Sequence, residues 1–283
     1  MPELPEIEVL KRDLEKEVVG RRIKDANVRP GTNAMKIVGR HGRRKEFQEL
    51  LEGAKIEHIR RIGRRLLIEL DNERTMVVAL GDSGLLLKTS ATEEIAPNTH
   101  IVIEWTIGGH LRLVDPDKKA DVYVCPTEDI PTLKELQSDA IDPLDAQNPL
   151  TWQHFSSLLE DRAEEMKKLM MDENFILGLG DIYSDEILWT AALRYDRKSN
   201  ELSSQDVRRL YRALVEILME AIKARGTTWG PEGFRDLHGD MGTFQHEIKV
   251  FERDGEPCRR CRNPLEKAKV AGSFTYFCPQ CQV

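Results

Sequence analysis

The chain of 283 residues lacks several features that mark specialised classes of protein. No apolar run approaches the roughly 20 residues that a membrane-spanning helix needs. The start has no basic region followed by an apolar core, so no signal peptide is expected. Internal repeats and low-complexity tracts are also missing from the sequence. These absences, with a length sufficient for two cores, predict a two-domain cytoplasmic protein without a membrane partner.

Cysteine is scarce, and the 42 lysines and arginines are outnumbered by 49 aspartates and glutamates. Four of the five cysteines lie near the C-terminus and Cys125 stands alone, so no disulfide framework is expected. The net charge of -7 argues only weakly against a nucleic-acid partner, because a local basic stripe is enough to bind phosphate. One basic cluster lies between residues 36 and 45 and is either solvated surface or a phosphate site. A second contains Arg60, Arg61, Arg64 and Arg65.

The four C-terminal cysteines form two CxxC pairs. Cys258-x2-Cys261 and Cys278-x2-Cys281 are separated by 16 residues. Two such pairs offer Zn²⁺ four thiolates in the tetrahedral geometry it prefers, and the intervening length suits a β-hairpin. A tail of this size cannot bury a core alone, so the metal would supply its folding energy. One structural Zn²⁺ is predicted, with a redox dithiol as the alternative.

Short strand-like runs dominate the first half of the chain. Glycine, aspartate and asparagine punctuate them, a pattern typical of a β-sandwich or barrel. A helix precedes them, because Ile7, Leu10, Leu14 and Val18 repeat at helical spacing and Gly20 can cap the helix. The runs are residues 23–28, 55–60, 66–70, 76–80, 85–87, 101–105, 111–114 and 122–124.

The second half has the periodicity of helices. A proline-rich and acidic linker with a short helix around Leu133 precedes it, and Ser203 with Asp206 resembles a capping box. Helices are predicted at 152–160, 163–171, 181–193 and 204–225, followed by a mobile loop at 226–242. The predicted domains are residues 1–125, a linker at 126–148, a helical domain at 149–242 and a zinc hairpin at 243–283.

Two interpretations fit the first ten residues, MPELPEIEVL. Removal of Met1 would leave Pro2 as an N-terminal secondary amine beside the Glu3 carboxylate. An α-amino group has a pKa of roughly 7.7–8, so part of it is nucleophilic at neutral pH. Its attack on a sugar carbon gives an iminium, and a neighbouring carboxylate can shuttle protons. Alternatively, Pro5 and Glu6 simply begin a helix.

Residues 170–186, MMDENFILGLGDIYSDE, contain a second distinctive pattern. One helix ends, two glycines permit a tight turn, and a new helix begins at Asp181. Backbone N–H groups at the start of a helix can hold a phosphate. An ordinary helical hairpin with Asp181 as N-cap explains the pattern equally well.

Together these segments resemble the formamidopyrimidine-DNA glycosylase / endonuclease VIII family of base-excision repair enzymes. The resemblance covers nearly the whole chain and is carried by PELPE (2–6), GLGDIYSDE (178–186), VFERDGEPCRRC (250–261) and FTYFCPQCQ (274–282). It implies an α+β fold, in which a β-sandwich domain with an N-terminal helix joins a helical helix–two-turn–helix domain with a zinc ribbon. It also implies a DNA glycosylase with AP lyase activity, in which Pro2 attacks C1′ of a flipped damaged nucleotide, Glu3 assists proton transfer and Glu6 supports the site.

The resemblance further implies DNA contacts at Arg61, Arg64, Lys118, Lys119, Gly180, Asp181 and Tyr183. Arg64 stands where the family's RxGK motif has lysine and keeps the charge, although arginine and lysine differ in reach. The two lysines retain charge in a segment that aligns with the family's DPRRFG loop, but its aromatic wedge is absent.

Three positions depart from the family pattern. Asp181 replaces the asparagine of GxGNIY, and an ionised aspartate can only accept hydrogen bonds and would repel phosphate. Ser273 replaces an arginine before the third cysteine, and Asp82 replaces a methionine after the Leu-Gly pair. Two lost charged hydrogen bonds, each contributing roughly 1.5–3 kcal/mol, predict weaker DNA binding.

Three functions therefore remain open. The chain is a working glycosylase/lyase, a lyase for abasic or single-stranded sites with a weakened duplex clamp, or a non-catalytic DNA-binding protein on a glycosylase scaffold. In each case we expect a monomer whose partner is damaged or abasic DNA, associated with the nucleoid when bound.

Overall fold

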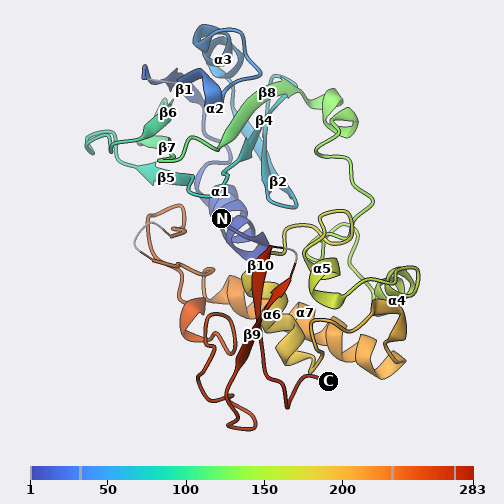
Figure 1. Ribbon diagram of the computed structural model, residues 1–283. Helices are drawn as coiled ribbons and strands as arrows, with labels where there is room; N and C mark the ends of the chain where they lie inside the picture. The colour runs from blue at the N-terminus through green and yellow to red at the C-terminus, as the bar shows by residue number, and fades with distance from the viewer. Residues whose placement is uncertain (1, 32–33, 231–232, 271) are drawn as a thin grey trace. The chain divides into compact units, whose positions relative to one another are not determined.

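The computed structural model describes the chain apart from residues 1, 32–33, 231–232 and 271 (Figure 1). The chain falls into two compact units. The first contains Met1–Ser138 and Ala224–Thr243, and the second contains Asp139–Lys223 and Phe244–Val283. The fold is α+β with antiparallel sheets, which confirms the predicted class. Within the described ranges, no helix is both long and apolar enough to cross a membrane.

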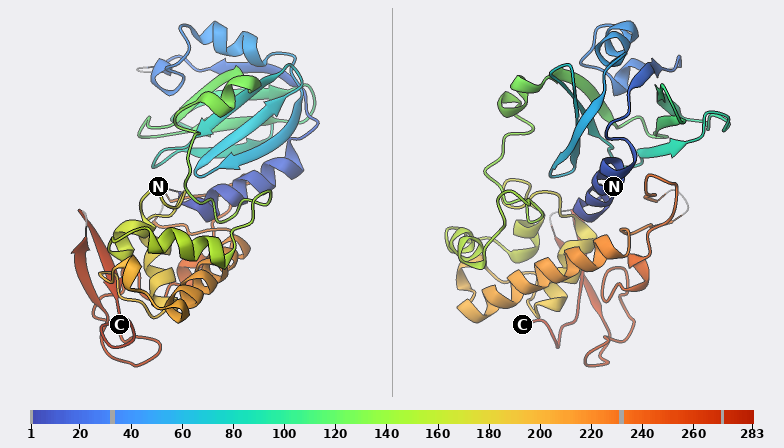
Figure 2. Two further views of the ribbon diagram at one scale, coloured as in Figure 1. Left: turned by 90° about the vertical axis from the view of Figure 1, so that its right-hand side faces the viewer. Right: turned by 180° about the vertical axis from the view of Figure 1, so that it is seen from behind.

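Two four-stranded antiparallel sheets make up most of the first unit (Figure 2). One has the order β1 (Ile23–Val28), β6 (Thr99–Trp105), β7 (His110–Val114), β5 (Leu85–Thr89). The other has the order β2 (Ile56–Ile62), β3 (Arg65–Leu70), β4 (Arg74–Ala79), β8 (Asp121–Pro126). Apolar residues of both sheets, such as Ile103 and Leu66, share one core. The predicted β-sandwich is confirmed.

Helix α1 (Leu4–Glu17) begins immediately after the Pro2–Glu3 pair. Pro5 fits its first turn, where a missing N–H costs nothing. Leu10 and Leu14 are fully buried, as their helical spacing predicted. The helix ends before Gly20, whose φ of 85° lies in the left-handed region that glycine tolerates.

The segment expected only to be a basic loop contains two helices, α2 (Ala34–Ile37) and α3 (Arg44–Leu51). α3 was missed because it buries just Phe47 and Leu51, too few apolar positions to show a clear period. The short helix expected around Leu133 is a 3₁₀ turn, η1 (Thr127–Thr132), just before it.

The second unit contains the predicted helices, with corrected ends. They are α4 (Trp152–Glu160), α5 (Met166–Met170), α6 (Asp181–Thr190) and α7 (Ser204–Lys223), with 3₁₀ turns η2 (Ser199–Glu201) and η3 (Phe244–His246). α5 begins later than predicted because Glu165 forms a β-bridge with Lys198 instead. α6 ends earlier because Ala192 adopts a left-handed φ of 58°.

A two-stranded hairpin closes the chain, formed by β9 (Glu266–Val270) and β10 (Ser273–Phe277). The antiparallel register pairs Ser273 with Val270 and Phe277 with Glu266. The hairpin lies between the second and third metal-ligating cysteines, as their spacing predicted. The domain boundaries proposed from sequence stay predictions, although residues 224–243 cluster with the first unit.

Candidate active site

The N-terminal Pro-Glu pair is held by the first turn of α1. Pro2 is buried, and Glu3 is the N-cap of the helix and 5% exposed. The Glu3 N–H donates to Glu6 Oε2 at 2.8 Å, and the Glu3 side chain accepts from the Glu6 backbone in a reciprocal capping box. The sequence was open between helix initiation and catalysis; the structure shows Pro2 and Glu3 at the start of a capped helix, and their catalytic role stays a prediction. Met1, whose removal would free the Pro2 amine, lies outside the described residues.

The second oxygen of Glu6 is used by a distant segment. Thr227 donates its backbone N–H to Glu6 Oε1 at 2.7 Å. The preceding Gly226 has a φ of 81°, and a Cβ there would lie 2.9 Å from Glu6 Oε1. Only glycine therefore allows the chain to approach the carboxylate this closely. Glu6 consequently joins the N-terminal pair to the segment expected to be a mobile loop.

An arginine fixes the same segment to α1. The Arg225 guanidinium lies 2.5 Å from Asp13 of α1 and 2.6 Å from the buried Asp236. Both carboxylates raise the pKa of Arg225, against the opposing effect of burial. Asp236 also accepts the N–H groups of His238 and Asp240. The start of the 226–242 stretch is thus tied to α1 through Thr227, and Asp236 is linked to α1 through Arg225.

The two arginines predicted to contact DNA in the β2–β3 turn differ in placement. The Arg61 side chain is 3% exposed and forms an ion pair with Glu8 of α1 at 3.0 Å. It also donates to the carbonyl of Gly63 at 3.1 Å. To reach a phosphate it would have to leave a buried ion pair, so its role in this structure is to hold the hairpin against α1. Arg64 lies half-buried in the turn.

Asp82 is paired rather than isolated. Its carboxylate lies 2.5 Å from the Lys119 ammonium, between two loops that also join through Ser83 and the buried Asp115. The hydrogen bond from Lys119 lowers the pKa of Asp82, and the charge of Arg64 acts in the same direction. The charge of Lys119 is thus neutralised by Asp82. Lys118, the preceding residue, is half-buried.

Helix α6 begins at Asp181 after the glycine turn, as predicted, but its N-cap is Gly180, so the expected capping role of Asp181 is wrong. The Asp181 side chain is 40% exposed, and its Oδ1 lies 3.8 Å from the ammonium of Lys167. Tyr183, predicted as a DNA contact, is fully buried with its ring 5.4 Å from that of Phe244. Burial removes the Tyr183 side chain from the surface of this unit.

Sequence reasoning missed the buried charge network behind this turn. The Lys167 side chain is 1% exposed and donates to Asp185 at 2.7 Å and to the carbonyl of Asp181 at 3.0 Å. Asp185 in turn accepts from the Thr275 hydroxyl at 2.5 Å and from the Tyr276 N–H at 2.8 Å. The network connects α5, the turn and β10. A lysine at an apolar position of the predicted helix was the available signal.

The four C-terminal cysteines fit a zinc ion. Their sulfurs all lie within 4.8 Å of one another. The Cys258–Cys281 and Cys261–Cys278 sulfurs are 3.9 and 3.4 Å apart, close to the roughly 3.8 Å edge of a tetrahedron with Zn–S bonds of about 2.3 Å. Against the effect of burial, backbone N–H donors lower the pKa of Cys258, whereas burial and the neighbouring sulfurs raise the pKa of Cys278 and Cys281, so the four thiols share a negative charge that a metal ion would stabilise.

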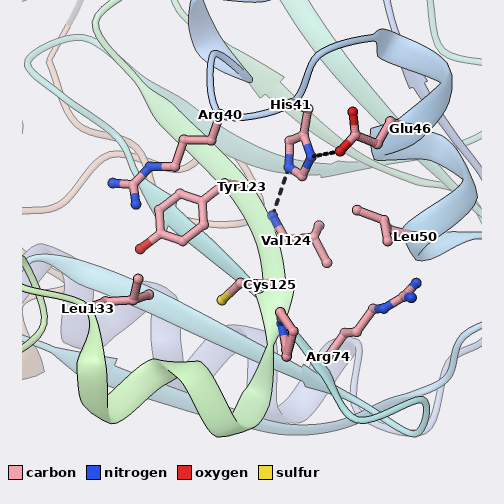
Figure 3. A pocket seen from close by; sticks show the side chains of 10 residues that line it. Arg40, His41, Glu46, Leu50, Arg74, Tyr123, Val124, Cys125 and Leu133 are labelled. Carbon is pink, nitrogen blue, oxygen red and sulfur yellow. Dashed lines mark hydrogen bonds and ion pairs between the residues drawn. The ribbon is translucent and has the colours of Figure 1, made fainter.

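The basic 36–45 cluster does not form an open phosphate site at Arg40. Its guanidinium lies 3.7 Å from the centre of the Tyr123 ring and pairs with Asp121 and Glu135 at 3.2 and 2.5 Å. His41 accepts the Val124 N–H at 3.0 Å. Figure 3 shows Arg40, His41, Tyr123 and Val124 among the side chains that line a pocket of about 330 Å³. The Arg40 charge is therefore balanced within the unit.

Comparison with known proteins identifies the class. Family models match three parts of the chain: the formamidopyrimidine-DNA glycosylase N-terminal domain at residues 1–122, its H2TH domain at 140–231, and the zinc finger found in FPG and IleRS at 255–283. Together these define a DNA-glycosylase architecture with a zinc finger.

Individual relatives cover the full length. Formamidopyrimidine-DNA glycosylases of Pelotomaculum thermopropionicum and Pediococcus pentosaceus are 33% and 35% identical over 100% of this chain and 99% of theirs. The MutM (Fpg) protein of Thermus thermophilus is 31% identical with a TM-score of 0.84, covering 99% of this chain and 98% of its own. Lactococcus lactis Fpg in a complex with abasic-site DNA is 26% identical, with a TM-score of 0.87 and 99% coverage of both chains. This chain belongs to the formamidopyrimidine-DNA glycosylase family.

Proposed function

We propose that this protein is a bifunctional DNA glycosylase and AP lyase that repairs damaged bases. The observation that carries the proposal is the placement of Pro2 and Glu3 at the start of α1, fixed by the two-sided hydrogen bonding of Glu6. Full-length membership of the family supports it. Its substrate is DNA with a damaged or missing base.

The chemistry follows from the secondary amine. Once Met1 is removed, the Pro2 nitrogen attacks C1′ of the flipped nucleotide, the bond from C1′ to the base breaks, and the base leaves with the electron pair. The sugar ring then opens: the C1′–O4′ bond breaks, O4′ takes a proton, and an iminium forms between Pro2 and C1′. The iminium acidifies the C2′ protons, so loss of one expels the 3′ phosphate oxygen and cuts the strand. Glu3, beside the amine, is placed to move the protons. Water then releases the sugar by hydrolysing the iminium.

The changes at the predicted DNA-binding positions support an alternative function. Asp82 forms an ion pair with Lys119, and Asp181 adds negative charge at the turn before α6. Both features favour substrates that need a weaker duplex clamp, such as abasic or single-stranded sites. We further propose a cytoplasmic monomer, nucleoid-associated when on DNA, because one chain holds the whole Pro2–Glu3–Glu6 arrangement.

Borohydride trapping tests the proposal. Protein with a Pro2 terminus verified by mass spectrometry should form a covalent adduct with abasic DNA when borohydride reduces the iminium. Protein that keeps an extra residue before Pro2 is the matched control, because its Pro2 nitrogen is an amide and should trap nothing. If the verified Pro2 form also traps nothing, the enzymatic proposal fails and the non-catalytic DNA-binding function takes its place.

A further inference from the structure

The pocket beside β8 lies at the outer edge of a sheet. β8 is last in the order β2, β3, β4, β8, so among the described strands one of its edges has no neighbour. On one side of the strand, Val124 and Leu50 line the pocket and pack with the main core (Figure 3). On the other side, Cys125 and Leu133 line it and pack with a second apolar cluster. The volume of about 330 Å³ lies within the roughly 300–1,000 Å³ of small-molecule sites.

Most polar side chains that line this pocket already have partners. The charge of Arg40 is balanced by two carboxylates, and His41 accepts a backbone N–H of β8. The Tyr123 hydroxyl donates to Glu135 at 3.0 Å. Glu46 accepts a backbone N–H at 2.9 Å, and this hydrogen bond lowers the pKa of its carboxyl group. Glu46 therefore contributes a negative charge to the lining at neutral pH.

Arg74 differs from these side chains. It is half-buried at the start of β4, where the register places it opposite Pro126 of β8. Figure 3 shows it on the same side of the strand as Leu50. Within the described part of the chain, its guanidinium has no hydrogen bond and no ion pair. One cation among apolar side chains is therefore available to a ligand.

We propose that this pocket binds a small monocarboxylic acid with an aromatic or branched apolar body. A guanidinium holds a planar carboxylate through two parallel hydrogen bonds, so Arg74 fits this group. Leu50, Pro126 and Leu133 supply the apolar surface that such a body needs. The charge of Glu46 in the same lining disfavours a second negative charge. The pocket should therefore prefer a carboxylate to a phosphate monoester with the same body.

Cys125 can report whether the pocket is occupied. It lines the pocket, and it is the one cysteine of the sequence outside the CxxC pairs. In zinc-loaded protein, iodoacetamide labelling of Cys125 can be followed by mass spectrometry of peptides. The probe 3-phenylpropionate, at ten times its Kd, should slow this labelling about tenfold, because only the empty pocket reacts. The concentration that halves the labelling rate gives the Kd.

Matched ligands and variants test the role of charge. The neutral 3-phenylpropionamide should bind about tenfold more weakly or worse, the scale of a lost charged hydrogen bond. Arg74→Met should weaken binding of the acid by a similar factor, and Arg74→Lys should lie between Arg74→Met and the wild type. Arg29→Met alters another half-buried arginine of this unit, which does not line the pocket, and should bind as the wild type does. Rates with and without ligand are compared within each variant, so a change in intrinsic thiol reactivity cancels.

Four results would overturn the inference. Labelling of Cys125 that saturating 3-phenylpropionate does not slow would show that the acid does not enter the pocket. Equal protection by the acid and the amide, or unchanged protection in Arg74→Met, would remove the role of the guanidinium. Stronger protection by 2-phenylethyl phosphate would replace the carboxylate with a phosphate ligand. Borohydride trapping is a separate measurement, because the pocket contains no residue of the Pro2–Glu3–Glu6 arrangement, so this inference and the proposed function can fail independently.

Discussion

Buried charges set the local geometry at the level of single residues. Arg61 pairs with Glu8 beneath the β2–β3 turn, and Lys167 pairs with Asp185 behind the glycine turn. Burial penalises each charged form, and burial raises the pKa of Asp185 even with Lys167 beside it. Such pairs are sensitive to the loss of one partner, because the remaining charge stays buried without compensation.

Lys167→Met should therefore destabilise the protein. Breaking a buried pair by removing one partner costs about 3–5 kcal/mol, and here the Asp185 carboxylate would be left buried. Lys168→Met is the matched control, because Lys168 is the adjacent lysine, 46% exposed, in a surface ion pair with Glu165. Chemical denaturation of both variants would measure the difference. Equal stabilities would show that Asp185 is compensated by its other hydrogen bonds.

Asp181 provides a prediction about binding. Asp181→Asn removes a negative charge and restores a donor at the start of α6, so affinity for abasic DNA should rise about tenfold, as expected from a charged hydrogen bond. Fluorescence anisotropy on labelled abasic duplex would measure this. Asp161→Asn, at the end of α4, controls for the change in net charge. Unchanged affinity would mean that the clamp is rebuilt elsewhere, for example at Arg60 or Arg65.

At the level of elements, the zinc hairpin and α6 support each other. Arg260 stacks on Trp189 of α6 at 3.8 Å and donates to the Trp189 carbonyl at 2.7 Å. Glu186 of α6 accepts three backbone N–H groups from residues 249–251. The cysteine knuckles are thus fastened to the helix that begins at the glycine turn. Loss of the metal should therefore destabilise the glycine turn before α6.

Removing one zinc ligand should show this dependence. Cys278→Ser should lower the zinc content from one ion per chain and lower the melting temperature, because metal binding supplies the folding energy of so short a segment. Cys125→Ser, which alters the cysteine outside the cluster, should keep the full zinc content. Metal analysis and calorimetry would measure both variants. A Cys278→Ser protein with a full complement of zinc would contradict the four-cysteine site.

At the scale of the whole molecule, an acidic protein has to bind an acidic polymer. The net charge is -7, and basic side chains would have to supply the contacts to phosphate. Three of these side chains, Arg40, Arg61 and Lys119, each form an ion pair with a carboxylate of their own unit. Each of these three cations would have to leave a carboxylate before it could pair with a phosphate. Affinity should fall with salt less steeply than for strongly basic DNA-binding proteins, because fewer counterions are released.

Strand preference distinguishes the two enzymatic functions. A glycosylase that flips bases from a duplex should cleave one lesion faster in double-stranded than in single-stranded oligonucleotide of the same sequence. Initial rates on the two substrates at equal salt would measure this. Equal or faster cleavage of the single strand would favour the alternative of an abasic-site or single-strand lyase, which the paired Asp82 and the charge of Asp181 support.

The sequence by itself determined the features that depend on local spacing. Periodicity and metal chemistry reveal features that are encoded within a few residues. These features are the CxxC pairs, the strand runs, the ends of α4 and the glycine turn before Asp181. The Pro2–Glu3 pair could be singled out because an N-terminal secondary amine has distinctive chemistry. Helix α3 was not predicted because it has too few apolar residues on one face to show a helical period.

Only the tertiary structure decided which residues meet across long stretches of chain. Glu6 and Thr227 are 221 positions apart, and no local pattern links them. Burial likewise decided that Arg61, which the sequence presents as one more exposed cation, is an internal partner of Glu8. Folding pairs charges according to which elements pack together. The sequence therefore predicted the Pro2 amine and the zinc ligands, and the fold showed that Glu6 links the turn carrying Pro2 and Glu3 to the distant Thr227.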